Sequence, residues 1–170
     1  MKEYISVIKN YATFSGRARR REYWMFTLFN FIFVIGTEIL DRIIGDTFNF
    51  NGVSLGFGYI YILYALFAFI PGLAVLVRRL HDVGKSGKLL VILFIVSIVS
   101  IAIAVFMMQS NGGSIFASIL LLIVWLGICI WLLVLTCTDS TVGPNKYGPN
   151  PKGIGNIEDF DFMSTPDANS

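Results

Sequence analysis

Basic residues gather in two short runs of this chain, and together they could bind a phosphate or a carboxylate. One run is Arg78-Arg79-Leu80-His81-Asp82, and the other, residues 17–21, holds four arginines. Arginine can donate two parallel hydrogen bonds to one anionic group. The runs therefore predict a site for an anionic headgroup or a protein partner where they meet, with these candidate ligand-binding residues: Arg17, Arg20, Arg78, Arg79, His81 and Asp82.

A simpler interpretation of the same runs is that they only fix the topology of a membrane protein. In that case the arginines reach toward the headgroups, and Glu22 and Asp82 pair with them locally. Both interpretations place the runs at a membrane boundary, where each basic residue contributes on the order of 1 kcal/mol to attraction by anionic lipid.

His81 is the only histidine in the chain. A general base needs an orienting carboxylate, and Asp82 is adjacent in sequence without obviously facing it. We therefore predict no catalytic residue and expect His81 to close its loop through a hydrogen bond. No metal site or cofactor is predicted, because His81 has no partners at a ligand spacing and the two cysteines, Cys129 and Cys137, cannot build a zinc site alone. An enzyme acting on a phosphorylated lipid, with His81 and Asp82 as acid and base, is the weakest alternative.

Asn30 and Glu38 are polar residues within the first long apolar stretch. Ionisable residues at membrane depth often mark a pathway or a partner. Glu38 thus suggests a small transporter or transporter subunit as a second function class. Hydrogen bonding between helices is the favoured interpretation of both residues.

A segment of turn-forming residues follows the last apolar stretch. Glycine, proline and asparagine favour tight turns and cannot continue a helix. We expect a fixed structural loop that folds back toward Arg78 and Arg79, with these key residues: Gly143, Asn145, Tyr147, Gly148 and Pro151.

Membrane helices are the elements that must hold these residues. Hydrophobic residues make up 55% of the 170 residues and charged residues only 14%, against about a quarter in soluble domains. A spanning helix needs roughly 20 mainly apolar residues. The chain offers four such stretches, at residues 23–40, 59–77, 89–107 and 115–135, and we predict an all-α membrane protein with four transmembrane helices.

The loops between these stretches differ in charge, which predicts the orientation. Residues 1–22 carry six basic groups and residues 78–88 carry four, whereas residues 41–58 carry one and residues 108–114 none. Basic loops stay in the cytoplasm. We therefore expect a multi-pass protein of the bacterial inner membrane with both termini in the cytoplasm.

The two ends of the chain differ in character. Tyr4, Val7, Ile8 and Tyr11 recur at helical spacing, which predicts an amphipathic helix lying in the membrane interface. Residues 153–170 form an acidic tail that we expect to be disordered. The membrane domain is accordingly predicted to comprise residues 1–152.

Three segments, Phe14–Trp24, Arg78–Gly87 and Gly143–Pro151, together resemble the bacterial membrane family called domain of unknown function 805. The Arg-Arg-Leu-His-Asp segment is the most specific element, and the resemblance covers roughly residues 4–152. Asn150 departs from the pattern, which tends to have Asp there. The resemblance implies a small inner-membrane protein with no established activity.

The leading functional hypothesis is a non-enzymatic membrane protein whose basic cytoplasmic surface binds anionic lipid headgroups or a protein partner. A homo-oligomer or a membrane protein partner is also compatible with the pattern. No nucleic-acid partner is expected, because the basic groups lie at the bilayer edge and not on a soluble face.

Overall fold

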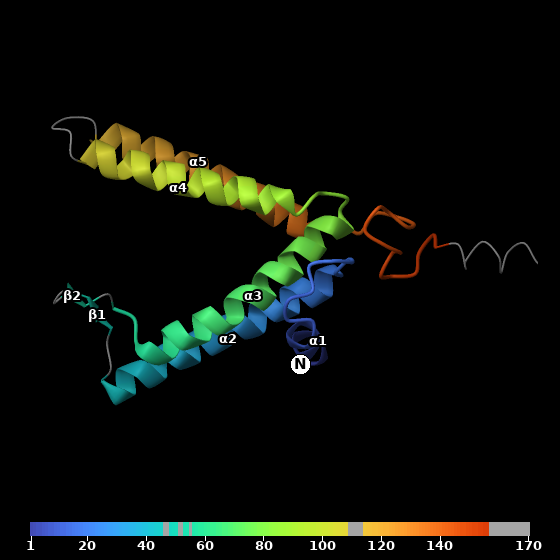
Figure 1. Ribbon diagram of the computed structural model, residues 1–170, viewed down its shortest axis with the longest axis horizontal. Helices are drawn as coiled ribbons and strands as arrows, with labels where there is room; N and C mark the ends of the chain where they lie inside the picture. Colours follow the sequence, from blue (N-terminus) through green and yellow to red (C-terminus); the bar gives the residue numbers. More distant parts are fainter. Residues whose placement is uncertain (46–47, 51–52, 55, 109–113, 157–170) are drawn as a thin grey trace, which may run out of the picture.

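The described part of the chain forms five helices and a minimal β-hairpin. The structure, a computed structural model, describes residues 1–45, 48–50, 53–54, 56–108 and 114–156. Four long helices form two helical hairpins, and the short helix α1 (Lys2–Lys9) crosses the first of them (Figure 1). The predicted all-helical architecture is confirmed, apart from the two-residue strands β1 (Asn49–Phe50) and β2 (Val53–Ser54), which pair antiparallel and were not expected.

The first helical hairpin consists of α2 (Arg20–Ile44) and α3 (Tyr59–Asp82). Helix α2 ends at Gly45, whose left-handed φ of 76° suits a residue without a Cβ. Both helices combine the length and the apolar composition needed to cross a membrane. Each contains its predicted stretch and extends beyond it, because α2 begins and α3 ends in one of the basic runs.

The second helical hairpin consists of α4 (Lys88–Met108) and α5 (Ser114–Cys137). Neither helix has a polar face, and most of their described large side chains are exposed. The shorter apolar stretches Lys88–Ile103 and Leu121–Cys137 lie within them. Apolar surface of this extent needs lipid or protein around it. That α4 and α5 cross the membrane stays a prediction.

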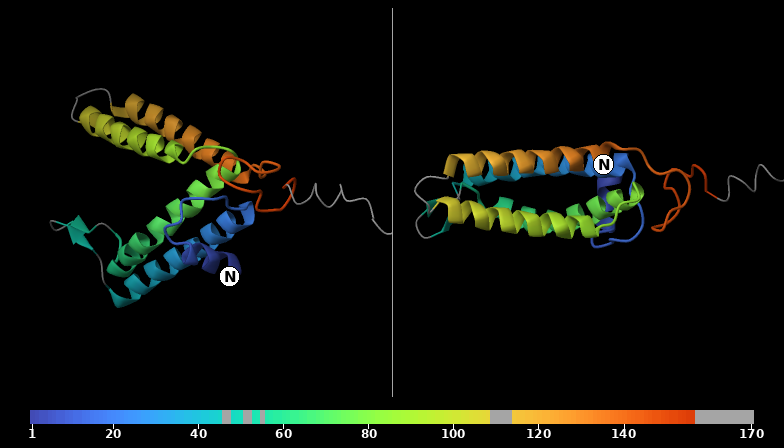
Figure 2. Two further views of the ribbon diagram at one scale, coloured as in Figure 1. Left: turned by 45° about the vertical axis from the view of Figure 1, so that its right-hand side comes forward. Right: turned by 90° about the horizontal axis from the view of Figure 1, so that it is seen from above.

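The two hairpins diverge from the turn that joins α3 to α4 (Figures 1 and 2). This turn, the segment before α2 and the segment after α5 all lie at one end of the long helices. The C-terminal ends of α2 and α4 and the N-terminal ends of α3 and α5 lie at the opposite end. The arrangement is the one that four antiparallel spans require, with the chain entering and leaving on the same side.

Helix α1 packs through its apolar face against the first hairpin. Val7 is fully buried in a small core with Ala18, Phe26 and Val75, and Tyr4 stacks on Phe26 at 5.4 Å between ring centroids. The helix ends at Lys9, so Tyr11 lies beyond it although it fits the helical spacing. The predicted acidic tail lies outside the described residues from residue 157 onward.

Candidate functional site

A buried ion cluster, defined here as Arg17, Arg79 and Asp82, lies where three segments of the chain meet. Arg17 Nε donates to Asp82 Oδ1 at 2.9 Å, and Arg79 donates to the second carboxylate oxygen. The Ser140 hydroxyl also donates to that second oxygen, at 2.6 Å. The three side chains of the cluster are at most 1% exposed. Helix geometry explains part of the cluster, because Arg79 precedes Asp82 by one turn at the end of α3.

Backbone carbonyls accept the remaining donors of the two arginines. Arg17 donates to the carbonyl oxygens of Gly143 and Thr141, both at 2.8 Å. Arg79 donates to the carbonyl oxygens of Thr136, at 3.2 Å, and of Thr138. The last carbonyls of a helix have no partner within it and carry the negative end of its dipole. The end of α5 therefore compensates part of the cluster's net positive charge.

Arg20 and Trp24, at the start of α2, also donate hydrogen bonds to the last carbonyl groups of α5. Arg20 donates to the Cys137 carbonyl at 3.0 Å, and the Trp24 indole donates to the Thr136 carbonyl at 3.3 Å. Arg20 also pairs with Asp139 at 3.3 Å, although it remains 44% exposed. Hydrogen bonding from Lys152 holds the pKa of Asp139 below its usual value. Arg20 thus bridges the interior contacts and the surface.

Arg78 lies outside the ion cluster and, unlike Arg17 and Arg79, has donors that no described atom accepts from. One terminal nitrogen donates to Glu22 Oε1 at 2.9 Å, which confirms the local pairing of Glu22 with a basic residue. Its Nε and its other terminal nitrogen are buried, and no described atom accepts from them. A buried donor without an acceptor costs about 1–3 kcal/mol. Among the six candidate residues, Arg78 is therefore the one with clear unused binding capacity.

His81 joins the segment before α2 to the loop after α5. Its Nδ1 donates to the Gly16 carbonyl at 3.2 Å, and its ring stacks on Tyr147 at 3.7 Å. Asn145 donates to the His81 carbonyl at 3.0 Å. His81 lies past the apolar part of α3, and burial lowers its pKa, which favours the neutral ring. Asp82 makes its described bonds to other groups, so the two do not form an acid–base pair.

The loop after α5 folds back onto the basic runs, but its contacts differ from those expected from the sequence. The described hydrogen bonds between residues 143–151 and the basic runs involve Arg17, Arg19 and His81 rather than Arg78 and Arg79. Gly143 accepts from Arg17, Pro151 accepts from Arg19, and an isolated bridge pairs Asn145 with Gly148. Asn150 is buried and donates to the Thr141 carbonyl at 3.0 Å, a bond that the Asp of the family pattern would not make. The loop is thus held by hydrogen bonds to three segments.

The polar residues inside α2 are placed differently. Tyr64 donates to Asn30 Oδ1 at 2.7 Å, a hydrogen bond between α2 and α3. Glu38 is half-buried, and its role in transport stays a prediction. Asp41, expected to begin a loop, is a buried residue of α2 that accepts from the backbone N–H groups of Ile60 and Tyr61 at 3.1 and 2.9 Å.

Several residues of the site were not predicted. Thr136, Ser140 and Thr141 supply carbonyl and hydroxyl groups to the ion cluster. The signal for them was the polar run directly after the last apolar stretch, residues 136–141. Within the described part of the chain, no group of three or more His, Cys, Asp or Glu side chains could hold a metal ion.

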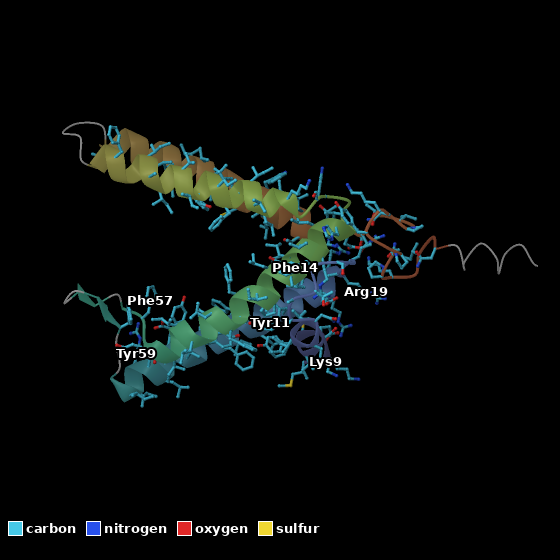
Figure 3. All side chains as sticks on the ribbon, in the orientation of Figure 1. Lys9, Tyr11, Phe14, Arg19, Phe57 and Tyr59 are labelled. Carbon is cyan, nitrogen blue, oxygen red and sulfur yellow. The ribbon has the colours of Figure 1, made fainter. Side chains whose placement is uncertain are left out.

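Basic side chains are distributed very unevenly between the two ends of the molecule. Arg42 lies near the end of α2, whereas Lys9 and Arg19 lie with α1 at the opposite end of the helical hairpin from Phe57 and Tyr59 (Figure 3). Twelve of the 13 lysines and arginines belong to α1, the two basic runs, the stretch from the end of α3 to the start of α4 or the segment after α5, against four described acidic residues there. The basic residues of this end are Lys2, Lys9, Arg17, Arg19, Arg20, Arg21, Arg78, Arg79, Lys85, Lys88, Lys146 and Lys152.

Comparison with known proteins gives consistent results along the chain. Residues 11–149 match the family model described as "Protein of unknown function (DUF805)". The chain is 38% identical over 152 residues to inner membrane protein YhaI of Escherichia coli (strain K12), covering 89% of this chain and 97% of that protein. It is 34% identical over 151 residues to inner membrane protein YhaH of the same strain, covering 88% and 95%. No solved structure matches the chain.

Proposed function

This chain belongs to the DUF805 family, and from that premise we propose that it is a non-enzymatic, four-span inner membrane protein whose basic cytoplasmic end binds anionic lipid headgroups. The observation that carries the proposal is the charge distribution, with twelve basic and four acidic described side chains at one end of the helices. Such an end attracts anionic lipid at about 1 kcal/mol for each basic residue at the surface. Both relatives are inner membrane proteins, which supports the location.

The arginines divide into two groups in this proposal. Arg17 and Arg79 hold the chain together, because their donors are directed at Asp82 and at backbone carbonyls. Arg19, Arg20 and Arg21 are exposed and supply charge to the surface. Arg78 belongs to neither group, because its two unused donors are buried, and in this proposal a phosphate oxygen that enters the site or an ordered water accepts from them.

The test compares lipid retention in matched variants. Arg19, Arg20 and Arg21 are replaced together by Gln, and the control is Arg42→Gln at the other end of α2. Native mass spectrometry of the gently extracted proteins measures bound phosphatidylglycerol against neutral lipid. We expect the triple variant to lose its anionic preference, by about fivefold for each charge removed, and the control to keep it. Equal retention in both would refute headgroup binding, and a protein retained in place of lipid would point to the partner alternative.

The topology needs a separate experiment, because removing basic residues can also change orientation. Reporter fusions at the C-terminus and in the α2–α3 and α4–α5 connections distinguish the sides of the membrane. The proposal requires the C-terminus to be cytoplasmic and both connections to be external. A C-terminal reporter active outside would contradict it, whatever the lipid measurement gives.

A further inference from the structure

A groove between α3 and the α4–α5 hairpin is a feature that the basic end does not explain. Side chains of the three helices line a space of about 460 Å³, and all of them are apolar or aromatic except Ser97. Phe69, Val91 and Phe94 on its walls are 59%, 59% and 64% exposed, so the groove is open toward the surroundings of the helices. Apolar spaces do not hold water. In a membrane protein such a space is therefore filled by hydrocarbon or by protein.

The size of the groove distinguishes between these two occupants. Its wall on α4 runs from Leu90 to Ser97, about 10 Å along the axis. A helix that spans the membrane is about 30 Å long, so a wall of this length would contact only about a third of it. The groove is therefore too short to be the packing surface for a transmembrane helix of a second copy. An unbranched acyl chain is narrower than a helix and fits.

The depth of the groove also matches a lipid chain. Leu132 and Trp125, on the α5 wall, precede Cys137 by roughly 7 and 18 Å along the helix. Half of a hydrocarbon core is about 15 Å thick. The groove therefore extends over one leaflet, from near the basic end to about the middle of the membrane.

A cation stands at the shallow end of the groove. Lys88 begins α4 and precedes the lining residue Val91 by three positions, so both lie on the same face of the helix. The Lys88 side chain is exposed, and among the described residues no carboxylate pairs with it. A phosphate attached to a chain in the groove would meet this ammonium group.

The geometry points to a phospholipid site in which one acyl chain fills the groove between α3, α4 and α5 and the headgroup phosphate lies at Lys88. The location of the headgroup on the cytoplasmic side rests on the proposed function, whereas the chain in the groove requires only that the helices lie in a membrane. The site holds one lipid for longer than the lipid that merely surrounds the protein.

Trp125 provides a direct readout, because it lines the groove while its indole N–H is bonded to Ser100 at 3.2 Å. The full-length protein with Trp24→Phe and Trp131→Phe keeps Trp125 as its only tryptophan. It is reconstituted in phosphatidylcholine vesicles that contain increasing fractions of phosphatidylcholine brominated on its acyl chains. Bromine quenches tryptophan fluorescence on contact, so quenching reports a chain beside Trp125.

Two further variants make the test specific. Ser97→Phe fills the groove from α4, and Ile98→Phe is the matched control, because Ile98 is 53% exposed and is not part of the lining. We expect quenching that saturates at a low brominated fraction, falls at least threefold in Ser97→Phe and is unchanged in Ile98→Phe. Quenching proportional to the brominated fraction and equal in all three proteins would overturn the proposal, since it would report ordinary surrounding lipid.

A second measurement covers the case in which the tryptophan replacements disturb folding. Native mass spectrometry of the otherwise unaltered protein counts tightly retained phospholipid with and without Ser97→Phe. Loss of one retained lipid supports the site, and no loss overturns it. A change from dimer to monomer without lipid loss would instead assign the groove to a second copy. The quenching probe is a neutral phospholipid, so a positive quenching result does not depend on any preference for anionic lipid. The groove proposal can therefore be supported even if the basic end shows no anionic preference, and the two proposals remain distinguishable.

Discussion

Asp82 and Asp41 are both buried, at opposite ends of the α2–α3 hairpin, but their carboxylates have different partners. Asp82 accepts from two guanidinium groups and a hydroxyl that come from three segments far apart in sequence. Asp41 accepts from the first backbone N–H groups of α3, which is the role of an N-cap residue supplied by the neighbouring helix. At the first end charged groups compensate one another, whereas at the second end a helix dipole compensates a single charge.

This difference predicts how each end tolerates mutation. Removing one member of a buried ion cluster leaves the others without compensation, which is strongly destabilising. Removing a carboxylate that faces backbone donors leaves only neutral groups unsatisfied, and water can reach part of them. The end with the ion cluster should therefore be the more sensitive one.

The largest effect is expected for Asp82→Asn, which leaves Arg17 and Arg79 buried without a counter-charge. We expect a loss of about 3–5 kcal/mol in the free energy of unfolding. Unfolding of the protein in detergent micelles, followed by size exclusion with fluorescence detection, measures the effect. Asp139→Asn is the control, since that carboxylate is exposed and its replacement should change stability far less than Asp82→Asn does.

A double-mutant cycle makes this prediction sharper. Arg17→Gln should be less harmful in the Asp82→Asn background than in the parent, because the charge it removes is no longer compensated there. Additive losses would mean that the two residues act independently. The ion cluster would then not be the reason why its end of the hairpin is more sensitive to mutation.

A smaller effect is expected at the other end. Asp41→Ala removes the acceptor for two backbone N–H groups of α3 and should cost about 1–2 kcal/mol. Asp41→Asn keeps one acceptor oxygen and should lie between the parent and the alanine variant. The same unfolding measurement applies, with Arg42→Gln as the control one position away. A loss as large as that of Asp82→Asn would remove the distinction between the two ends.

Gly58 tests the same contact from the side of α3. A Cβ at this position would lie 1.9 Å from Asp41 Cγ, so Gly58→Ala must displace the carboxylate. We expect it to destabilise at least as much as Asp41→Ala, because it adds a steric clash to the loss of both hydrogen bonds. Equal stability of Gly58→Ala and the parent would show that the carboxylate does not hold this helix start.

Between the two ends of the hairpin, a backbone carbonyl of α3 that has no partner in its own helix accepts a hydrogen bond from another segment. Pro71 has no N–H, so the Phe67 carbonyl lacks its partner within α3. The Tyr11 hydroxyl donates to that carbonyl at 3.0 Å. Tyr11→Phe should therefore cost about 1 kcal/mol in the parent but much less in a Pro71→Ala background, where the backbone bond can form. An equal cost in both backgrounds would mean that Tyr11 acts only through packing, which its ring contact with Phe67 already provides.

The helices could be predicted from the sequence, whereas the contacts of the buried charged residues could not. The apolar stretches gave the four long helices, because hydrophobic runs are local and the helices that contain them are continuous. The partners of Arg17 are 65 to 131 positions away in the chain, and no periodicity encodes such a contact. Asp41 was misplaced for a related reason, since a carboxylate near an apolar boundary resembles a loop residue until the neighbouring helix that it caps is known.

The smallest expected effect concerns pH. Burial lowers the pKa of His81 in the folded protein below its value near 6.5 in the unfolded chain, so the unfolded chain binds more protons as the pH falls. The stability contributed by neutral His81 is complete above about pH 6.5 and is lost as the pH decreases toward the lowered pKa. Unfolding measured from pH 7.5 to pH 5 should thus show a loss in the parent that is smaller in His81→Gln. The Gln side chain can still donate to the Gly16 carbonyl but does not titrate, which separates the charge of His81 from its hydrogen bond. An identical pH profile in both proteins would show that other groups dominate the pH dependence, and would leave the hydrogen bond to Gly16 and the stacking on Tyr147 as the contributions of His81 to this end of the molecule.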